Sequence, residues 1–135
     1  MKYFYCDSCF LISCYQDGNL GCLSRFKEQF HISETQINDE LIKPSDLADA
    51  VKKTVTVIQD RDKIINKTNE LVSLYDNLSR YDCLCMAFAI LDGYCLITDN
   101  KALIKKCVKN SIETKSSNDI LREFNLGGDV WRRCK

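Results

Sequence analysis

Residues 78–100 have the sequence LSRYDCLCMAFAILDGYCLITDN, and this stretch decides the fold. Apolar side chains cover most of the circumference of a helix predicted over 79–91, so this helix is expected to lie at the centre of the protein. The Asp92-Gly93 pair predicts its end. The next residues, 94–98 (YCLIT), form a continuous apolar run, which is typical of a buried strand in a parallel sheet.

Short apolar runs and amphipathic stretches alternate along the rest of the chain, which is the pattern of βαβ units around a parallel sheet. We therefore expect one α/β domain over residues 1–126, a three-layer α/β/α sandwich with a central parallel sheet of four to five strands, followed by a C-terminal tail at 127–135. Strands are predicted over 2–6, 29–33, 54–59, 94–98 and 111–114, and helices over 9–15, 20–27, 34–42, 47–53, 64–75, 79–91, 101–109 and 118–124, with a charged turn at 60–63.

Charge and composition restrict the function. The chain has 135 residues, in which 19 Lys and Arg balance 19 Asp and Glu. Without a basic excess, bulk electrostatics cannot hold nucleic acid, but a nuclease whose acidic site is bridged to phosphate by a metal ion is compatible with this balance. No apolar run approaches the ~20 residues that a membrane span needs. Nine Cys without a secretory signal indicate a reducing compartment, so we expect a cytoplasmic protein.

Four carboxylates occupy positions where an open parallel sheet binds its ligands. Asp7 follows the first predicted strand, Asp99 follows the strand over 94–98, and Glu40 and Asp82 lie on helices that could face the same crevice. Hard oxygen ligands of this kind suit Mg²⁺ or Mn²⁺, which polarise a phosphoryl oxygen and activate water. Acidic residues are also common as helix caps, and each of the four could have that role alone.

Three motifs, taken in order, resemble the PIN domain, a family of metal-dependent ribonucleases: YFYCDSCFLI at 3–12, HISETQINDEL at 31–41 and the stretch at 78–100. The resemblance covers roughly residues 2–124, and the size and motif layout are similar to the single-domain VapC-type toxins of bacterial toxin–antitoxin pairs. It implies a Mg²⁺-dependent endoribonuclease that hydrolyses RNA phosphodiester bonds. It further implies a homodimer and an antitoxin partner.

The resemblance also implies roles for the acids. Asp7, Asp82 and Asp99 would hold Mg²⁺ or Mn²⁺, directly or through water. Glu40 would orient a water ligand or help to deprotonate the attacking water.

The residues beside these acids are expected to have supporting roles. Ser8 and Thr98 could contribute hydroxyl hydrogen bonds around the site or could only cap helices. Asn100 and Lys101 are next to Asp99 in the sequence and could touch phosphate. Asn100 is also a departure from the family, because many members carry an acid at this position. An amide oxygen could still bind the ion, but it brings no charge.

Two other functions fit parts of the sequence. Cys6 and Cys9 have the spacing and placement of a thioredoxin-like redox pair, but the sole proline, Pro44, lies between predicted helices, where it cannot face such a pair. The second alternative is a PIN-like binding protein that has lost catalysis, which only Asn100 supports. His31 is the only histidine, which argues against Ser–His or Cys–His hydrolase chemistry.

Overall fold

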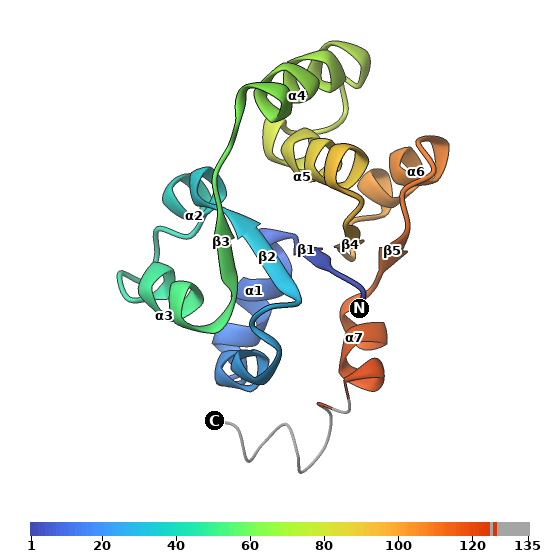
Figure 1. The fold of residues 1–135 in the computed structure, drawn as a ribbon. Helices are drawn as coiled ribbons and strands as arrows, with labels where there is room; N and C mark the ends of the chain where they lie inside the picture. The colour runs from blue at the N-terminus through green and yellow to red at the C-terminus, as the bar shows by residue number, and fades with distance from the viewer. Residues whose placement is uncertain (125, 127–135) are drawn as a thin grey trace.

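The computed structural model describes residues 1–124 and 126, and these contain a five-stranded parallel sheet with the order β3-β2-β1-β4-β5 (Figure 1). The chain builds outward from β1 to β2 and β3, and then returns to the other side of β1 to add β4 and β5. The predicted parallel sheet of four to five strands is confirmed. The strands are β1 (Phe4–Cys6), β2 (Phe30–Ser33), β3 (Thr56–Ile58), β4 (Cys95–Ile97) and β5 (Thr114–Lys115).

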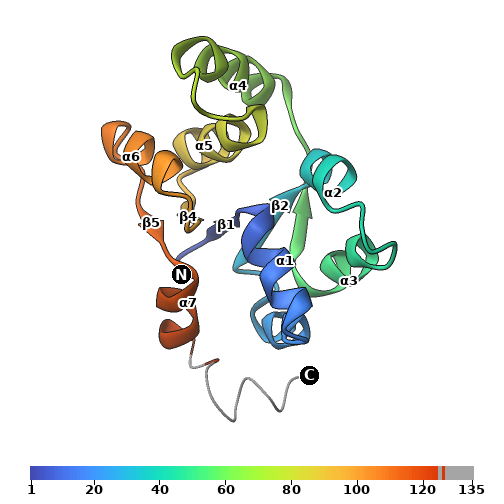
Figure 2. The same ribbon diagram turned by 180° about the vertical axis from the view of Figure 1, so that it is seen from behind.

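Helices cover both faces of the sheet, which gives the three-layer α/β/α sandwich that the sequence predicts (Figure 1 and Figure 2). On one face, α1 and α3 pack against each other and against the 3₁₀ helix η1; on the other, α4 packs on α5, which contacts β1 and β4. None of the described helices combines the length and the apolar character that crossing a membrane requires. The helices are α1 (Ser8–Gln16), η1 (Leu20–Phe26), α2 (Glu34–Glu40), α3 (Leu47–Thr54), α4 (Asp62–Leu74), α5 (Arg80–Asp92), α6 (Lys101–Lys109) and α7 (Ser117–Glu123).

Helix α5 is the central helix, as its apolar circumference predicts. All of residues 83–89 are buried, and the Tyr5 ring of β1 stacks on Phe88 with 5.0 Å between the ring centroids. Ser79 caps the first turn of α5, and Gly93 takes the left-handed conformation, with a φ of 75°, after the last turn. Because a residue with a side chain is strained at this φ, the glycine sets the point where α5 ends and the chain turns into β4.

The last strand is the main departure from the sequence prediction. It spans Thr114–Lys115, and not 111–114. Ser111 has a φ of 58°, and the Ile112 amide donates to the Cys107 carbonyl oxygen at 2.9 Å. These residues therefore close the end of α6, and only the residues after them are free to pair with β4.

Element boundaries elsewhere differ by a few residues. The helix predicted over 34–42 ends at Glu40, two residues before the exposed Ile42. The predicted turn at 60–63 is shorter, because α4 begins at Asp62, an acid that favours the positive end of the helix dipole. The segment predicted as a helix over 20–27 is the 3₁₀ helix η1.

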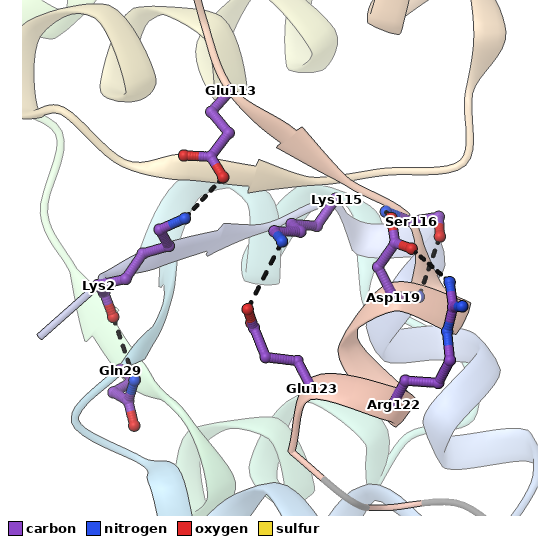
Figure 3. Close-up of polar contacts among 8 residues, drawn as sticks. All are labelled: Lys2, Gln29, Glu113, Lys115, Ser116, Asp119, Arg122 and Glu123. Carbon is purple, nitrogen blue, oxygen red and sulfur yellow. Dashed lines mark hydrogen bonds and ion pairs between the residues drawn. The ribbon is translucent and has the colours of Figure 1, made fainter.

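Polar contacts join the β5 edge and α7 to the rest of the domain (Figure 3). Lys2 Nζ lies 2.6 Å from Glu113 Oε2, and Lys115 Nζ lies 3.5 Å from Glu123 Oε1. Ser116 caps α7 in a capping box. Solvent screens these ion pairs, so they contribute little to stability, and the pair of Lys115 with Glu123 orients α7 on the sheet edge. The tail predicted at 127–135 lies outside the described residues.

Candidate active site

The candidate site lies at the carboxyl ends of β1 and β4, where the strand order of the sheet reverses. This switch point is where open parallel sheets bind their ligands. The Asp7 amide, just after β1, donates to the Ile97 carbonyl oxygen of β4 at 3.0 Å. The pairing of the two strands therefore places Asp7 beside Thr98, as expected from their positions in the sequence.

Asp7 is held by hydrogen bonds on both of its carboxylate oxygens. Thr98 Oγ1 donates to Oδ2 at 2.8 Å, and the Cys9 amide donates to Oδ1 at 3.4 Å as the cap of α1. The side chain is buried, and burial is the main cause that raises the pKa of this carboxyl. The charges of Asp82 and Glu40 raise the pKa further, while the bonds from Thr98 and Cys9 lower it. Asp7 therefore caps α1, and it lies near enough to two other acids of the predicted site for their charges to raise its pKa.

Glu40, at the end of α2, is bound by two donors on one oxygen. Ser8 Oγ donates to Glu40 Oε1 at 2.6 Å, and Gln36 Nε2 donates to the same oxygen at 2.9 Å. Gln36 Nε2 also donates to Ser8 Oγ at 3.1 Å. Ser8 is thus not a helix cap; its hydroxyl connects the start of α1 to Glu40. Glu40 Oε2 accepts no hydrogen bond from the described residues.

Gln36 is the residue at this site that the sequence analysis missed. It is fully buried, and its Oε1 accepts hydrogen bonds from the Tyr5 hydroxyl and, at 3.5 Å, from Cys85 Sγ. The Tyr5 hydroxyl in turn accepts from the Ser33 amide at 3.0 Å. Gln36 lies four residues before Glu40 and hence on the same face of α2, and this spacing was the available signal.

Asp82, near the start of α5, forms a capping box with Ser79. The Ser79 amide donates to Asp82 Oδ2 at 3.1 Å, and the Asp82 amide donates to Ser79 Oγ at 3.0 Å. The side chain is half-buried, and its charge reaches both Asp7 and Cys9. Asp82 therefore combines a cap with a place in the acidic cluster.

Asn100 and Asp99 both accept hydrogen bonds from helix amides. Asn100 Oδ1 caps α6 by accepting from the Ala102 and Leu103 amides at 3.0 and 3.2 Å, so an ion bound by this oxygen would compete with the cap. Asp99 is exposed and accepts a hydrogen bond from the Ser117 amide of α7 at 2.9 Å.

Thr98 and Lys101, on either side of this pair, differ in their contacts. Thr98 Oγ1 accepts from the Asn100 amide at 3.1 Å as well as donating to Asp7. Lys101 is the exposed first residue of α6.

Cys9 shows that the four acids lie at the same end of the sheet. Its thiol is exposed in the first turn of α1. The pKa of this thiol is raised, first by partial burial and then by the charges of four residues: Asp7, Glu40, Asp82 and Asp99. Each of these acids comes from a different part of the chain, so their shared effect on one thiol follows from the fold. The four carboxylates that the sequence analysis selected therefore lie near enough for their charges to act on one thiol, and their joint role stays a prediction.

The donor chemistry of this cluster fits Mg²⁺ or Mn²⁺, because carboxylate oxygens are the ligands that these ions prefer. Within the part of the chain that the structure describes, no three His, Cys, Asp or Glu side chains are close enough to hold one ion as they stand. Asp99 is turned to Ser117, and Asp82 to the Ser79 amide. Binding one ion would require these carboxylates to move closer to one another.

Cys6 and Cys9 do not have the environment of a redox pair. Cys6 is fully buried in β1, and burial raises the pKa of its thiol well above the usual value. The pKa of Cys9 is also raised. Redox-active cysteines need the opposite shift, towards the thiolate, so the structure does not favour the thioredoxin-like alternative.

Comparison with known proteins gives structural but no sequence matches. No family model and no curated protein matches the chain. The crystal structure of PAE2754 from Pyrobaculum aerophilum is similar with a TM-score of 0.64 at 15% identity, covering 93% of this chain and 91% of that one. This is a PIN-like fold.

Two further solved structures share this fold. A chain of the DNA-bound VapBC complex from Salmonella typhimurium has a TM-score of 0.63 at 16% identity, covering 87% of this chain and 99% of that one. A chain of VapBC2 from Rickettsia felis, bound to a DNA fragment from their promoter, has a TM-score of 0.57 at 14% identity, covering 84% and 98%. At such identities the likeness shows the PIN-like fold alone.

Proposed function

We propose that the chain is a Mg²⁺- or Mn²⁺-dependent endoribonuclease that hydrolyses phosphodiester bonds in RNA. The observation that carries this proposal is the position of Asp7 and Glu40 at the switch point of the sheet, bound there by Thr98 and Ser8. Asp82 and Asp99 lie near enough for their charges to act, with those of Asp7 and Glu40, on the Cys9 thiol. Such a cluster of negative charge repels an RNA backbone unless a cation lies between them. The PIN-like fold supports the same function by analogy only.

Asp7, Asp82 and Asp99 are the residues that would hold the ion. When bound, a divalent ion stabilises charge on a phosphoryl oxygen and lowers the pKa of a water ligand. Asp7 is the buried one of the three, and Thr98 and the start of α1 fix its carboxylate. Its burial keeps its charge poorly solvated, which strengthens its attraction for a cation.

Glu40 is the candidate general base. Ser8 and Gln36 fix its Oε1, which leaves Oε2 to accept a proton from the attacking water. Gln36 is itself held, because its Oε1 accepts from the Tyr5 hydroxyl and its Nε2 donates to Ser8 Oγ, so its bond to Glu40 limits rotation of the carboxylate. In this mechanism Gln36 is a positioning residue, and Glu40 moves the proton.

We further propose that the protein is a cytoplasmic toxin that forms a homodimer and is blocked by an antitoxin. Two of the similar structures are VapBC complexes, which supports a protein partner. The alternative is a PIN-like binding protein that has lost catalysis, and Asn100, an uncharged residue where many family members carry an acid, is the one sequence feature that supports it. A small gene next to the one for this chain, whose product binds it and stops cleavage, is the expected antitoxin.

The direct test is cleavage of total RNA by the purified chain with Mg²⁺ and with EDTA. Mapped ends should show internal cuts only with the ion. Asp7→Asn and Asp82→Asn should abolish cleavage while leaving the fold intact. Asp49→Asn is the matched control, because Asp49 is an exposed acid of α3 away from the site. Cleavage by Asp7→Asn at the rate of the unaltered protein would refute the assignment.

A further inference from the structure

A second pocket adjoins the acidic site and has no role in the mechanism above. It lies among α2, the residues after β3, α4 and α5, on the side of the molecule where the chain runs from β3 to α4 (Figure 1). We call it the Asp60 pocket; among its lining residues are Asp39, Asp60, Ile65, Arg80, Tyr81 and Leu84.

Two lining residues are sequence neighbours of the candidate catalytic acids. Asp39 precedes Glu40 on α2, and Tyr81 precedes Asp82 on α5. The Tyr81 hydroxyl donates to Asp39 Oδ2 at 3.0 Å, which ties α2 to α5 at this point. Helices α2 and α5 thus border both the Asp60 pocket and the candidate site.

Asp60 gives the pocket an unsatisfied acceptor. Its Oδ1 is shielded from solvent and has no hydrogen-bond partner among the described residues. Leaving a buried acceptor of this kind unpaired is costly, so such groups in native proteins normally have a partner or a ligand. Because Asp60 lines the pocket, a small rotation of its carboxylate would let a ligand's hydrogen-bond donor reach this oxygen.

The other lining residues suit a flat, polar-edged ring. Tyr81 offers an aromatic face, and Ile65 and Leu84 add apolar surface. Arg80 uses one of its five donors on Asn69 Oδ1, at 2.9 Å, which leaves others for acceptors of a ligand. The volume of about 210 Å³ is several times the ~30 Å³ of one water and below the ~300 Å³ at which drug-sized sites begin.

We propose that the Asp60 pocket binds a guanine base of the RNA substrate beside the cleaved phosphate; this rests on the proposed function. Single-stranded RNA is recognised by splayed bases that stack on aromatic or arginine side chains and bond through their edges. Guanine presents two neighbouring donors, N1–H and the N2 amino group, to Asp60. Its O6 and N7 are acceptors that arginine commonly binds. Uracil has no amino group, so the pocket selects against it.

Binding of the four nucleoside 5′-monophosphates, measured by NMR titration of the purified chain in EDTA, tests this without any cleavage. GMP should bind more tightly than AMP, CMP or UMP. Asp60→Asn should weaken GMP binding by roughly 5- to 150-fold, the range of one bidentate base contact. Asp62→Asn, an exposed acid two residues along the chain and outside the pocket, is the matched control and should bind GMP unchanged.

Tyr81→Leu is the second variant and should weaken all four nucleotides, because it removes the stacking surface. Equal binding of the four nucleotides, no binding of GMP, or unchanged GMP binding by Asp60→Asn would each overturn the proposal.

Cleavage mapping separates this inference from the proposed function. RNA cut by the unaltered protein should carry guanine at one fixed position next to the cut, and Asp60→Asn should lose that preference. If RNA is never cut but GMP binding depends on Asp60, the nuclease proposal fails and the pocket stands. If RNA is cut with no dependence on Asp60, the pocket proposal fails and the nuclease stands.

Discussion

Replacing Gln36 with Met should destabilise the protein through Tyr5 and Glu40. Met has a similar length, so packing is largely kept while the amide is lost. The fully buried Tyr5 hydroxyl would lose its acceptor, at a cost of about 1–3 kcal/mol, since water cannot reach it. Glu40 is half-buried, so water replaces part of its lost bond. Together these losses lower the free energy of unfolding by about 2–4 kcal/mol, which corresponds to a fall of about 7–14 °C in Tm for a domain of this size.

A double-mutant cycle with Tyr5→Phe isolates the buried bond. Removing both partners of a buried hydrogen bond costs less than removing one, so the double variant should be about 1–2 kcal/mol more stable than the two single losses predict. Urea unfolding followed by circular dichroism measures all four free energies of unfolding. Gln16→Met, at the exposed end of α1, is the control and should be neutral. Losses that add to within about 0.5 kcal/mol, or a nearly neutral Gln36→Met, would refute the reasoning.

Three further predictions concern the acidic cluster and its neighbours. Folding raises the pKa of Asp7 above 3.8, so the protonated carboxyl stabilises the folded state at low pH, and this stabilisation is lost as pH rises through the folded pKa. The side chain of Asp7→Asn does not titrate, so the variant should become more stable relative to the unaltered protein as pH rises through that range. Urea unfolding at several pH values measures this difference. The raised pKa of Cys9 predicts slow alkylation at pH 8, and mass spectrometry of the Cys9 peptide should show faster alkylation in Asp7→Asn; an unchanged rate would contradict the shared field. Asn100→Ala removes the cap of α6, so its free energy of unfolding in urea should fall by about 1 kcal/mol while RNA cleavage is kept. Asn100→Asp should keep the cap and the same free energy of unfolding.

The fold could be predicted from the sequence because its main signals are local. The continuous apolar run over 94–98 contains the buried strand β4, and the apolar circumference of 79–91 matches the central helix α5. The strand expected at 111–114 was placed too early, because the positive φ of Ser111 and the last turn of α6 compete with strand pairing there. Ser111 and Ile112 either close the last turn of α6 or pair with β4, and residue propensities alone do not show which of the two is formed.

The candidate site was predictable in its acids but not in their contacts. Asp7 could be located because it directly follows a strand at the switch point. The spacing of Gln36 to Glu40 places both on one face of α2, but the sequence does not show that Gln36 also bonds Tyr5, which comes from strand β1. Asn100 was interpreted as a weakened ion ligand, yet its oxygen caps α6, and its neighbour Asp99 contacts α7. Which donor each oxygen meets depends on side-chain directions that the sequence does not specify.

Binding of Mn²⁺ followed by electron paramagnetic resonance tests the central claim most directly, that Asp7, Asp82 and Asp99 hold a divalent ion. Titration of the purified chain should show saturable binding of Mn²⁺ that Mg²⁺ displaces, and Asp7→Asn should lose it while Asp49→Asn keeps it. Equal Mn²⁺ binding by Asp7→Asn and the unaltered protein, or no binding by either, would contradict the account.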